Sequence, residues 1–226
     1  MKEAAHGFRS AVRINNGLLG RLEKRILLWI AHRLPDWINS DHLTALGLLA
    51  MIAAGVCYGF SGQHPAMLWA VNLCLAINWF GDSLDGTVAR VRDRQRPRYG
   101  FYVDHVVDIF GALALLSGMA LSGRMSPIVA AGVLVAFLFL SIESYLATYT
   151  IGEFHLSFGG FGPTELRILL AIGNVFLIYY RMGRFFGHPM LVLDIGGLCA
   201  IAGMGLLMIW AVVRHTAQLY DEERLG

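Results

Sequence analysis

The chain has 226 residues and a formal net charge of +2 at pH 7, with 56% hydrophobic and only 15% charged residues. Soluble globular domains are about a quarter charged, so this composition excludes an ordinary soluble domain. The length fits one domain, covering residues 1–226, and we expect no nucleic-acid partner.

The first 40 residues form a charged arm. They carry charges throughout and have no clean apolar core, which argues against a cleavable signal peptide. Residues 18–34 predict an amphipathic helix, because one face gathers the apolar side chains Leu18, Leu22, Ile26, Trp29 and Ile30. Trp29 and Trp37 suit the headgroup layer of a membrane, so we expect this helix to lie along the cytoplasmic surface.

Six apolar stretches follow, at residues 43–61, 65–81, 105–122, 127–150, 164–182 and 190–213. Stretches of roughly 17–25 apolar residues cross a bilayer as helices, because no water is present there to satisfy any other open backbone. The sequence therefore predicts an all-α integral membrane fold with six transmembrane helices after an interfacial helix. In this interpretation, residues 1–40 are the cytoplasmic arm and residues 41–215 are the six-helix core.

Basic residues are distributed unevenly among the connecting segments. Seven Lys and Arg precede the first stretch, and the second connection carries Arg90, Arg92, Arg94, Arg96 and Arg98. Because basic residues favour the cytoplasmic side, we expect both termini and the segment 86–104 to be cytoplasmic. The membrane is then the inner or plasma membrane if the source is bacterial. Arg181 and Arg184 are a mild exception to this rule, because the fifth connection is expected on the opposite side of the membrane.

Carboxylates are concentrated around the second connection. Asp82 and Asp85 fall on the same helix face as Arg90, and Asp104 and Asp108 share a face of the next helix. Carboxylates at bilayer depth are costly and usually functional, and four converging ones cannot all stay ionised without compensation. Hard oxygen ligands select Mg²⁺ or Mn²⁺, and four carboxylates are enough for two such ions.

A basic residue and small residues complete the pattern. Arg90 offers a planar fork suited to phosphate, while Gly86 and Ala89 let a base or a phosphate approach the helix closely. Carboxylates, a divalent cation, an arginine and small residues together suggest a nucleotide diphosphate as substrate. A structural ion-pair network is the alternative for the carboxylates, and an orientation signal is the alternative for the arginines after Arg90.

The complete pattern resembles the signature of the CDP-alcohol phosphotransferase (phosphatidyltransferase) family. It reads Asp82-x-x-Asp85-Gly86-x-x-Ala89-Arg90, then nine residues, then Gly100-x-x-x-Asp104-x-x-x-Asp108, and all eight fixed positions are present. The segment Leu34-Pro35-Asp36-Trp37-Ile38, the pair Asp104-His105 and the stretch 148–165 are similar to choline/ethanolamine phosphotransferases. Those enzymes carry additional spans, whereas this chain has six apolar stretches.

The resemblance implies a six-helix fold, a homodimer, and a metal-dependent enzyme of phospholipid biosynthesis. Such an enzyme cleaves the diphosphate of a CDP-alcohol, releases CMP and transfers the substituted phosphate to an acceptor alcohol. Carried over to this sequence, the resemblance assigns metal binding to Asp82, Asp85, Asp104 and Asp108. It assigns nucleotide binding to Gly86, Ala89, Arg90 and Gly100, with the diphosphate at Arg90.

Two residues are candidates for the catalytic base. The resemblance implies Asp108, but a carboxylate bound to a metal is a weak base, even though the metal also acidifies a nearby hydroxyl. His105 is the alternative, because an unperturbed histidine pKa near 6.5 suits proton acceptance at neutral pH. On a helix, however, His105 points about 100° away from Asp104.

Polar residues elsewhere in the apolar stretches receive structural or binding roles. We expect Glu143 to contact a cationic headgroup, a metal-linked water or a neighbouring helix. We expect Glu165 and Arg167 to pair with each other or to border the acceptor pocket. Asn174 and Asp194 are expected to hydrogen-bond between helices, and the histidines outside the motif, His215 among them, are expected to be solvated.

Three functions remain open from the sequence. The flanking residues favour a donor such as CDP-choline or CDP-ethanolamine with diacylglycerol as acceptor. The alternative is a CDP-diacylglycerol donor that gives its phosphatidyl group to a soluble polar alcohol. A cation transporter is a remote third, because the carboxylates crowd at one leaflet and do not follow a path across the membrane.

Overall fold

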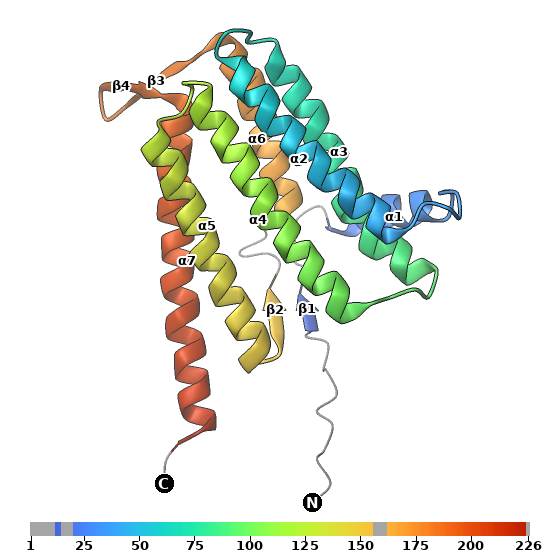
Figure 1. The fold of residues 1–226 in the computed structure, drawn as a ribbon. Helices are drawn as coiled ribbons and strands as arrows, with labels where there is room; N and C mark the ends of the chain where they lie inside the picture. The colour runs from blue at the N-terminus through green and yellow to red at the C-terminus, as the bar shows by residue number, and fades with distance from the viewer. Residues whose placement is uncertain (1–11, 15–19, 156–161, 225–226) are drawn as a thin grey trace, which may run out of the picture.

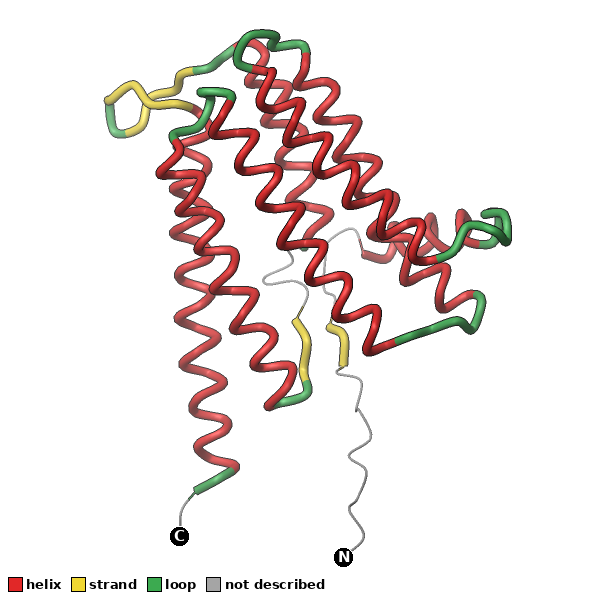
Figure 2. The backbone as a smooth tube through the Cα atoms, in the orientation of Figure 1, coloured by secondary structure: helices red, strands yellow, loops and turns green. Residues whose placement is uncertain are grey.

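The computed structural model describes residues 12–14, 20–155 and 162–224, and most of them are helical (Figures 1 and 2). The helices are α1 (Gly20–Ala31), α2 (Ser40–Ser61), α3 (Met67–Val91), α4 (Pro97–Leu121), α5 (Pro127–Thr150), α6 (Pro163–Tyr179) and α7 (Val192–Glu222). Two short pairs of strands supplement the predicted all-α fold. β1 (Val12–Ile14) pairs in parallel with β2 (Glu153–His155), and β3 (Met182–Phe185) forms an antiparallel hairpin with β4 (His188–Leu191).

Several helix starts follow from local sequence. Asn39 accepts a hydrogen bond from the backbone N–H of His42 at 3.0 Å, and the His42 ring lies 3.4 Å from the Asn39 N–H, so α2 begins with a reciprocal cap. Proline stands in the first turn of α4, α5 and α6, where its missing N–H costs no helix bond. The helices α2, α3, α5, α6 and α7 begin within a few residues of the predicted stretches, whereas α4 begins at Pro97, well before the predicted residue 105, because its first turns carry polar residues.

Among the described residues, four helices are long and apolar enough to cross a membrane: α2, α4, α5 and α7. The helix α6 has only 17 residues, and α3 continues beyond residue 81 to Val91, so that it carries the motif residues Asp82, Asp85 and Arg90. These apolar helices indicate an integral membrane protein. The count of six spans remains a prediction.

Small residues bring α2, α3 and α4 into close contact. A Cβ atom on Gly55 of α2 would lie 2.2 Å from the carbonyl oxygen of Ala114 in α4, and one on Gly118 would lie 1.9 Å from the oxygen of Gly55. On the other side of α2, a Cβ on Gly81 of α3 would lie 2.5 Å from the oxygen of Leu43. Only glycine permits these approaches, and Gly81 directly precedes the motif.

The first helix packs on the protein through Ile30 of the predicted apolar face and through Leu27 and Ala31, which lie outside it. Leu27 and Ala31 are buried against Leu84 and Val88 of α3. Ile26 and Trp29, which belong to the predicted apolar face, are 41% and 60% exposed. In Figure 1, α1 lies across the lower end of α3. This arrangement anchors the helix to the core and leaves apolar side chains outward, as the prediction of an interfacial helix requires.

The connections alternate between the two ends of the bundle. The α3–α4 turn and β2 lie at one end, and the α2–α3 turn and the β3–β4 hairpin lie at the other (Figures 1 and 2). Arg124 at that second end is buried, and it donates to the carbonyl oxygens of Ser61 and Leu177 at 2.8–3.1 Å. Arg181 donates to Gly123 O at 2.6 Å. Arg124 and Arg181 thus satisfy backbone carbonyls, which accounts for basic residues away from the predicted cytoplasmic end.

Candidate functional site

The motif begins where α3 leaves its close contact with α2. Asp85 is buried, with 6% of its surface exposed, and its Oδ2 accepts a hydrogen bond from the Thr44 hydroxyl of α2 at 2.7 Å. Its Oδ1 accepts the backbone N–H of Gly86. Because Gly81 lets α2 approach within backbone distance one turn earlier, Thr44 can reach this carboxylate. Nothing in the spacing of the motif indicates Thr44 as its partner.

The electrostatics of Asp85 show that the motif carboxylates lie near one another. Asp85 stands beyond the predicted membrane stretch 65–81. Burial, followed by the negative charge of Asp104 and then that of Asp82, raises its pKa from 3.8 to about 7, although the Thr44 and Gly86 hydrogen bonds lower it. A buried carboxylate with negative neighbours favours any nearby cation. This is the environment that the spacing of the motif predicts.

Asp82 has a partner from a distant part of the chain. Its Oδ2 lies 2.6 Å from Nη2 of Arg167 in α6. Arg167 also donates from Nε to Oδ1 of Asn78 at 2.7 Å. The expectation for Arg167 was a pair with Glu165 or a place beside the acceptor pocket, and its ion pair with Asp82 was not anticipated. Glu165 accepts the backbone N–H of Gly162 at 3.0 Å and so caps α6.

The second half of the motif lies on α4, with Asp104 half-buried and Asp108 exposed. His105 is half-buried, and its ring contacts Phe101 and the edge of Tyr145 in α5 at centroid distances of 4.1 and 4.6 Å. Its Nδ1 contacts the Phe101 carbonyl oxygen. Because a carbonyl only accepts, Nδ1 carries the proton there, and Nε2 is the basic nitrogen of the neutral ring. The base assignment stays a proposal for both Asp108 and His105.

The predicted nucleotide-binding residues lie along the end of α3 and the start of α4. A Cβ on Gly86 would lie 3.5 Å from Nη1 of Arg90, so the guanidinium extends back over the glycine. Arg90 is exposed and donates to the Thr87 hydroxyl at 3.2 Å. Ala89 is half-buried, and a Cβ on Gly100 would meet nothing within 4 Å. Gly86 thus gives room to the Arg90 guanidinium, and the space at Gly100 is open; nucleotide binding by these residues stays a prediction.

The donors fit a divalent cation by their chemistry. They are carboxylates only, and they come from two helices whose charges act on Asp85. Their present arrangement is looser than a coordination shell. In the described part of the chain, no three His, Cys, Asp or Glu side chains are gathered closely enough to hold a metal ion. One carboxylate oxygen of Asp82 contacts Arg167, and both oxygens of Asp85 accept protein hydrogen bonds.

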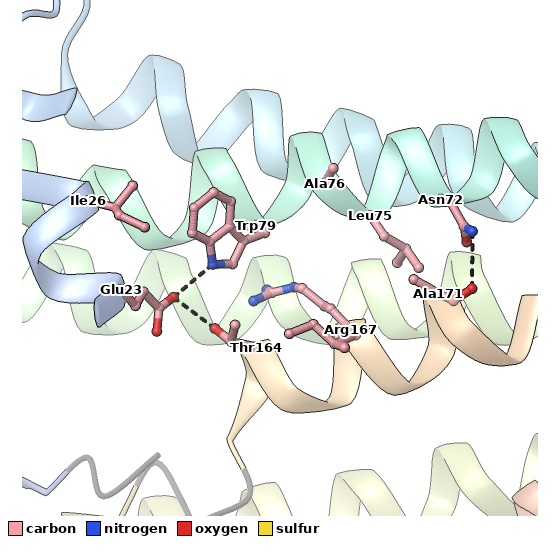
Figure 3. A pocket seen from close by; sticks show the side chains of 10 residues that line it. Glu23, Ile26, Asn72, Leu75, Ala76, Trp79, Thr164, Arg167 and Ala171 are labelled. Atoms are coloured by element: carbon pink, nitrogen blue, oxygen red, sulfur yellow. Dashed lines mark hydrogen bonds between the residues drawn. The ribbon is translucent and has the colours of Figure 1, made fainter. Parts of the chain in front are cut away.

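An apolar cavity of about 310 Å³ lies between α1, α3 and α6 and is bordered by Arg167, the partner of Asp82 (Figure 3). Leu75, Ala76 and Ile168 are among the apolar residues that line it. Its polar residues are Glu23, Asn72, Thr164 and Arg167. The Glu23 carboxylate accepts hydrogen bonds from Trp79 and Thr164 at 2.8 Å and from Ser83 at 3.2 Å, so it joins all three helices. Nothing in the periodicity indicated a role for Glu23.

Polar residues away from the motif join helices. Asn174 accepts the Tyr58 hydroxyl and donates to Asn72 at 2.8 Å, and Asp194 accepts from Ser126, which confirms the predicted helix–helix roles. Glu143 lies 2.6 Å from Nδ1 of His215 in α7. Of the three roles expected for Glu143, contact with a neighbouring helix is thus confirmed. The prediction of a solvated His215 is wrong, because its side chain is 12% exposed and faces α5.

Arg92 shows that one arginine of the second connection is structural. It donates to the carbonyl oxygens of Leu34, Pro35 and Ile38, in the turn between α1 and α2. Arg96 pairs with Asp41 at the start of α2. Both residues therefore tie the end of α3 and the following turn to the segment before α2, in addition to any role in orientation.

Fold and site together define a helical membrane protein with a carboxylate motif at one end of two adjacent helices. The sequence profile of the CDP-alcohol phosphatidyltransferase family matches residues 37–215, and the chain belongs to this family. The match includes both halves of the motif, the cavity residues of α3 and α6, and the Glu143–His215 pair.

Two relatives illustrate the range of the similarity. A CDP-diacylglycerol–serine O-phosphatidyltransferase from Encephalitozoon cuniculi (strain GB-M1) is 30% identical over 139 residues, which are 59% of this chain and 35% of that protein. A phosphatidylinositol phosphate synthase from Cutibacterium acnes (strain DSM 16379 / KPA171202) is 34% identical over 87 residues, which are 37% of this chain and 38% of that protein. The matched region is little more than a third of the length of these curated relatives.

Proposed function

We propose that this chain is a phospholipid-biosynthetic transferase that cleaves a CDP-alcohol, releases CMP and passes the substituted phosphate to an acceptor alcohol. The observation that carries the proposal is the complete carboxylate motif on adjacent ends of α3 and α4, within a chain that belongs to the CDP-alcohol phosphatidyltransferase family. Burial, together with the negative charges of Asp104 and Asp82, raises the pKa of Asp85 to about 7, and such a perturbed carboxyl supports a cation site.

Each motif residue has a proposed task. Asp82, Asp85, Asp104 and Asp108 hold one or two Mg²⁺ or Mn²⁺ ions, which when bound supply positive charge to the diphosphate and its leaving group. Arg90 binds the diphosphate, and Gly86, Ala89 and Gly100 leave space for the nucleotide. Asp108 accepts the proton of the acceptor alcohol, with His105 as the alternative through Nε2. These groups would act mainly by orientation and electrostatic stabilisation.

The cavity between α1, α3 and α6 supports a lipid among the substrates. Its lining is almost entirely apolar, and it borders Arg167, which contacts Asp82 of the motif. An acyl chain in this cavity would place a lipid headgroup near the carboxylates, because buried apolar surface favours hydrocarbon. A lipid site is needed with either donor. With a small CDP-alcohol the lipid is the acceptor diacylglycerol, and in the alternative reaction the lipid is the donor CDP-diacylglycerol.

Two donors have support from different observations. The flanking residues around Pro35 and His105 favour a small CDP-alcohol such as CDP-choline or CDP-ethanolamine, with diacylglycerol as acceptor. The similarity to a CDP-diacylglycerol–serine O-phosphatidyltransferase favours CDP-diacylglycerol as donor and a soluble polar alcohol as acceptor. We further propose a cytoplasmic active site, which the distribution of arginines supports, and a homodimer, which the family resemblance implies.

The donor can be tested with purified full-length protein, Mn²⁺ and two labelled substrates. In one reaction CDP-choline carries the label in its choline and diacylglycerol is supplied. In the other, CDP-diacylglycerol carries the label in its acyl chains and serine, inositol phosphate or glycerol phosphate is supplied. Label that enters lipid only in the first reaction supports the small donor, and new labelled phospholipid only in the second supports CDP-diacylglycerol. No product in either reaction would contradict the proposed transferase.

A further inference from the structure

The ion pair between Arg167 and Asp82 places a protein cation on a motif carboxylate. The two side chains are 17% and 36% exposed, so the pair is partly shielded from water. It joins α6 to α3 across 85 positions of sequence. A contact of this kind is fixed by helix packing, and it is unlike the mobile surface pair of Arg96 and Asp41, whose side chains are about half exposed.

Arg167 has a second anchor that does not depend on Asp82. Its Nε donates to Oδ1 of Asn78 at 2.7 Å. Asn78 is 6% exposed, and its Nδ2 donates to the carbonyl oxygen of Gly47 at 3.0 Å. The amide is therefore held by α2, and it orients the guanidinium beside the motif even when Nη2 changes its partner.

The arrangement of the carboxylates agrees with a protein cation at Asp82. No three potential metal ligands are gathered within the part of the chain that the structure describes. A divalent ion at the Asp82 oxygen that contacts Arg167 would stand within a few ångströms of the guanidinium, and two cations at that separation repel each other. Asp82 therefore has two alternative partners.

We propose that Arg167 competes with the divalent cation for Asp82, so that cation binding and the Arg167–Asp82 ion pair exclude each other. The inference rests on the proposed function, because it concerns the same metal site. Arg167 is then a positioning residue. It fixes the Asp82 carboxylate when the cation is bound elsewhere, and it stays on Asn78 at the wall of the α1–α3–α6 cavity when Asp82 turns to the ion.

Competition predicts that removing the Arg167 charge strengthens cation binding. A unit positive charge within a few ångströms of a divalent ion disfavours that ion by more than 1.4 kcal/mol even at an effective dielectric constant near 20, so we expect roughly tenfold tighter binding or more. A structural role alone predicts the opposite, because loss of the helix contact would loosen the site and weaken binding.

The test is a Mn²⁺ titration of the purified full-length protein, with free Mn²⁺ measured by electron paramagnetic resonance. Arg167→Met removes the charge and keeps the length of the side chain, and Arg167→Gln keeps a donor for Asn78 if the first variant does not fold. Arg167→Lys keeps the charge. Arg96→Met is the matched control, because it removes one positive charge from a pair that involves no motif carboxylate.

The expected result is Mn²⁺ binding about tenfold tighter in Arg167→Met and Arg167→Gln, with Arg167→Lys and Arg96→Met within about threefold of the wild type. Unchanged or weaker binding in both neutral variants, with normal binding by the wild type, would overturn the competition and leave the proposed metal site intact. Failure of the wild type and of every variant to bind Mn²⁺ would instead overturn the metal site and the competition together.

Discussion

The Thr44 hydroxyl of α2 donates a hydrogen bond to the buried Asp85 carboxylate of α3 at 2.7 Å. This contact connects the first apolar helix to the motif and satisfies one oxygen of a carboxylate that is 6% exposed. The same hydroxyl also contacts the Ser40 carbonyl oxygen at 3.1 Å, so its position is set by α2 itself. Thr44 is thus part of the environment that tunes Asp85, although it lies outside the motif.

Replacing Thr44 by valine is expected to destabilise the protein by about 1–3 kcal/mol, because it leaves a buried acceptor unsatisfied while keeping the shape of the side chain. The measurement is thermal unfolding in detergent, followed by tryptophan fluorescence. Thr150→Val is the control, because the Thr150 hydroxyl donates to the Leu146 carbonyl on an exposed turn. Equal melting temperatures for the two variants would show that the Asp85 contact contributes nothing.

The pKa of Asp85 predicts how stability depends on pH. It is about 7 in the folded protein and 3.8 for an ordinary aspartate, so the folded state holds this proton more tightly than the unfolded state. The contribution of Asp85 to stability is therefore full below about pH 4 and is lost as the pH rises through 7. With a chelator present, we expect the melting temperature to fall between about pH 4 and pH 7.

The variant Asp85→Asn isolates the contribution of this carboxyl to the pH dependence of the melting temperature from that of the other titrating groups. The amide does not ionise, so we expect the variant to lose much of the decline in melting temperature over that range. Added Mg²⁺ is expected to reduce the decline in the wild type, since a cation stabilises the ionised carboxylate. Parallel pH profiles for wild type and Asp85→Asn would contradict the raised pKa.

The absence of a side chain at Gly55 allows the backbones of α2 and α4 to cross in close contact. A Cβ on Gly55 would collide with the backbone of Ala114 at 2.2 Å, whereas one on Gly59 of the same helix meets nothing within 4 Å. We therefore expect Gly55→Ala to destabilise the protein by about 1–3 kcal/mol through overpacking, and Gly59→Ala to be neutral or slightly stabilising. Unfolding in a denaturing detergent, followed by circular dichroism, compares the two. An equal loss of stability in both variants would contradict the close crossing.

The Glu143–His215 contact predicts a coupling between α5 and α7. The two side chains are 9% and 12% exposed, so either single substitution leaves a shielded partner without its hydrogen bond. In a double-mutant cycle with Glu143→Gln and His215→Phe, we expect a coupling free energy of about 1 kcal/mol. The measurement is the unfolding free energy of the four proteins. Additive effects would show that the contact stabilises nothing.

The local sequence pattern alone is enough to locate the helices and the motif residues. The stretch 127–150 matches α5 residue for residue, because Pro127 starts the helix and no glycine or proline breaks its second half. The β3–β4 hairpin was not predicted, since apolar residues continue on both sides of its turn at Phe186 and Gly187. The boundary of α3 was also missed, because its last turns carry the charges that ended the apolar stretch.

Contacts between distant segments could not be predicted from one sequence. Arg167 and Asp82 are 85 positions apart, and His215 and Glu143 are 72 apart. Each residue alone reads as an isolated polar group, and only the packing of α6 on α3 or of α7 on α5 gives it a partner. Glu23 was likewise assigned to a surface helix, although it joins α1 to α3 and α6 beside the cavity.

The most direct test of the transferase is the release of CMP. Purified protein with Mn²⁺ is incubated with CDP-choline plus diacylglycerol, or with CDP-diacylglycerol plus a polar alcohol, and CMP is quantified by chromatography. We predict CMP release with one of the two donors, lost at least a hundredfold in Asp108→Ala and retained in Arg96→Met, because general base and metal-ligand losses cost about that much. No CMP from any CDP-alcohol, or equal release by wild type and Asp108→Ala, would contradict the proposed function.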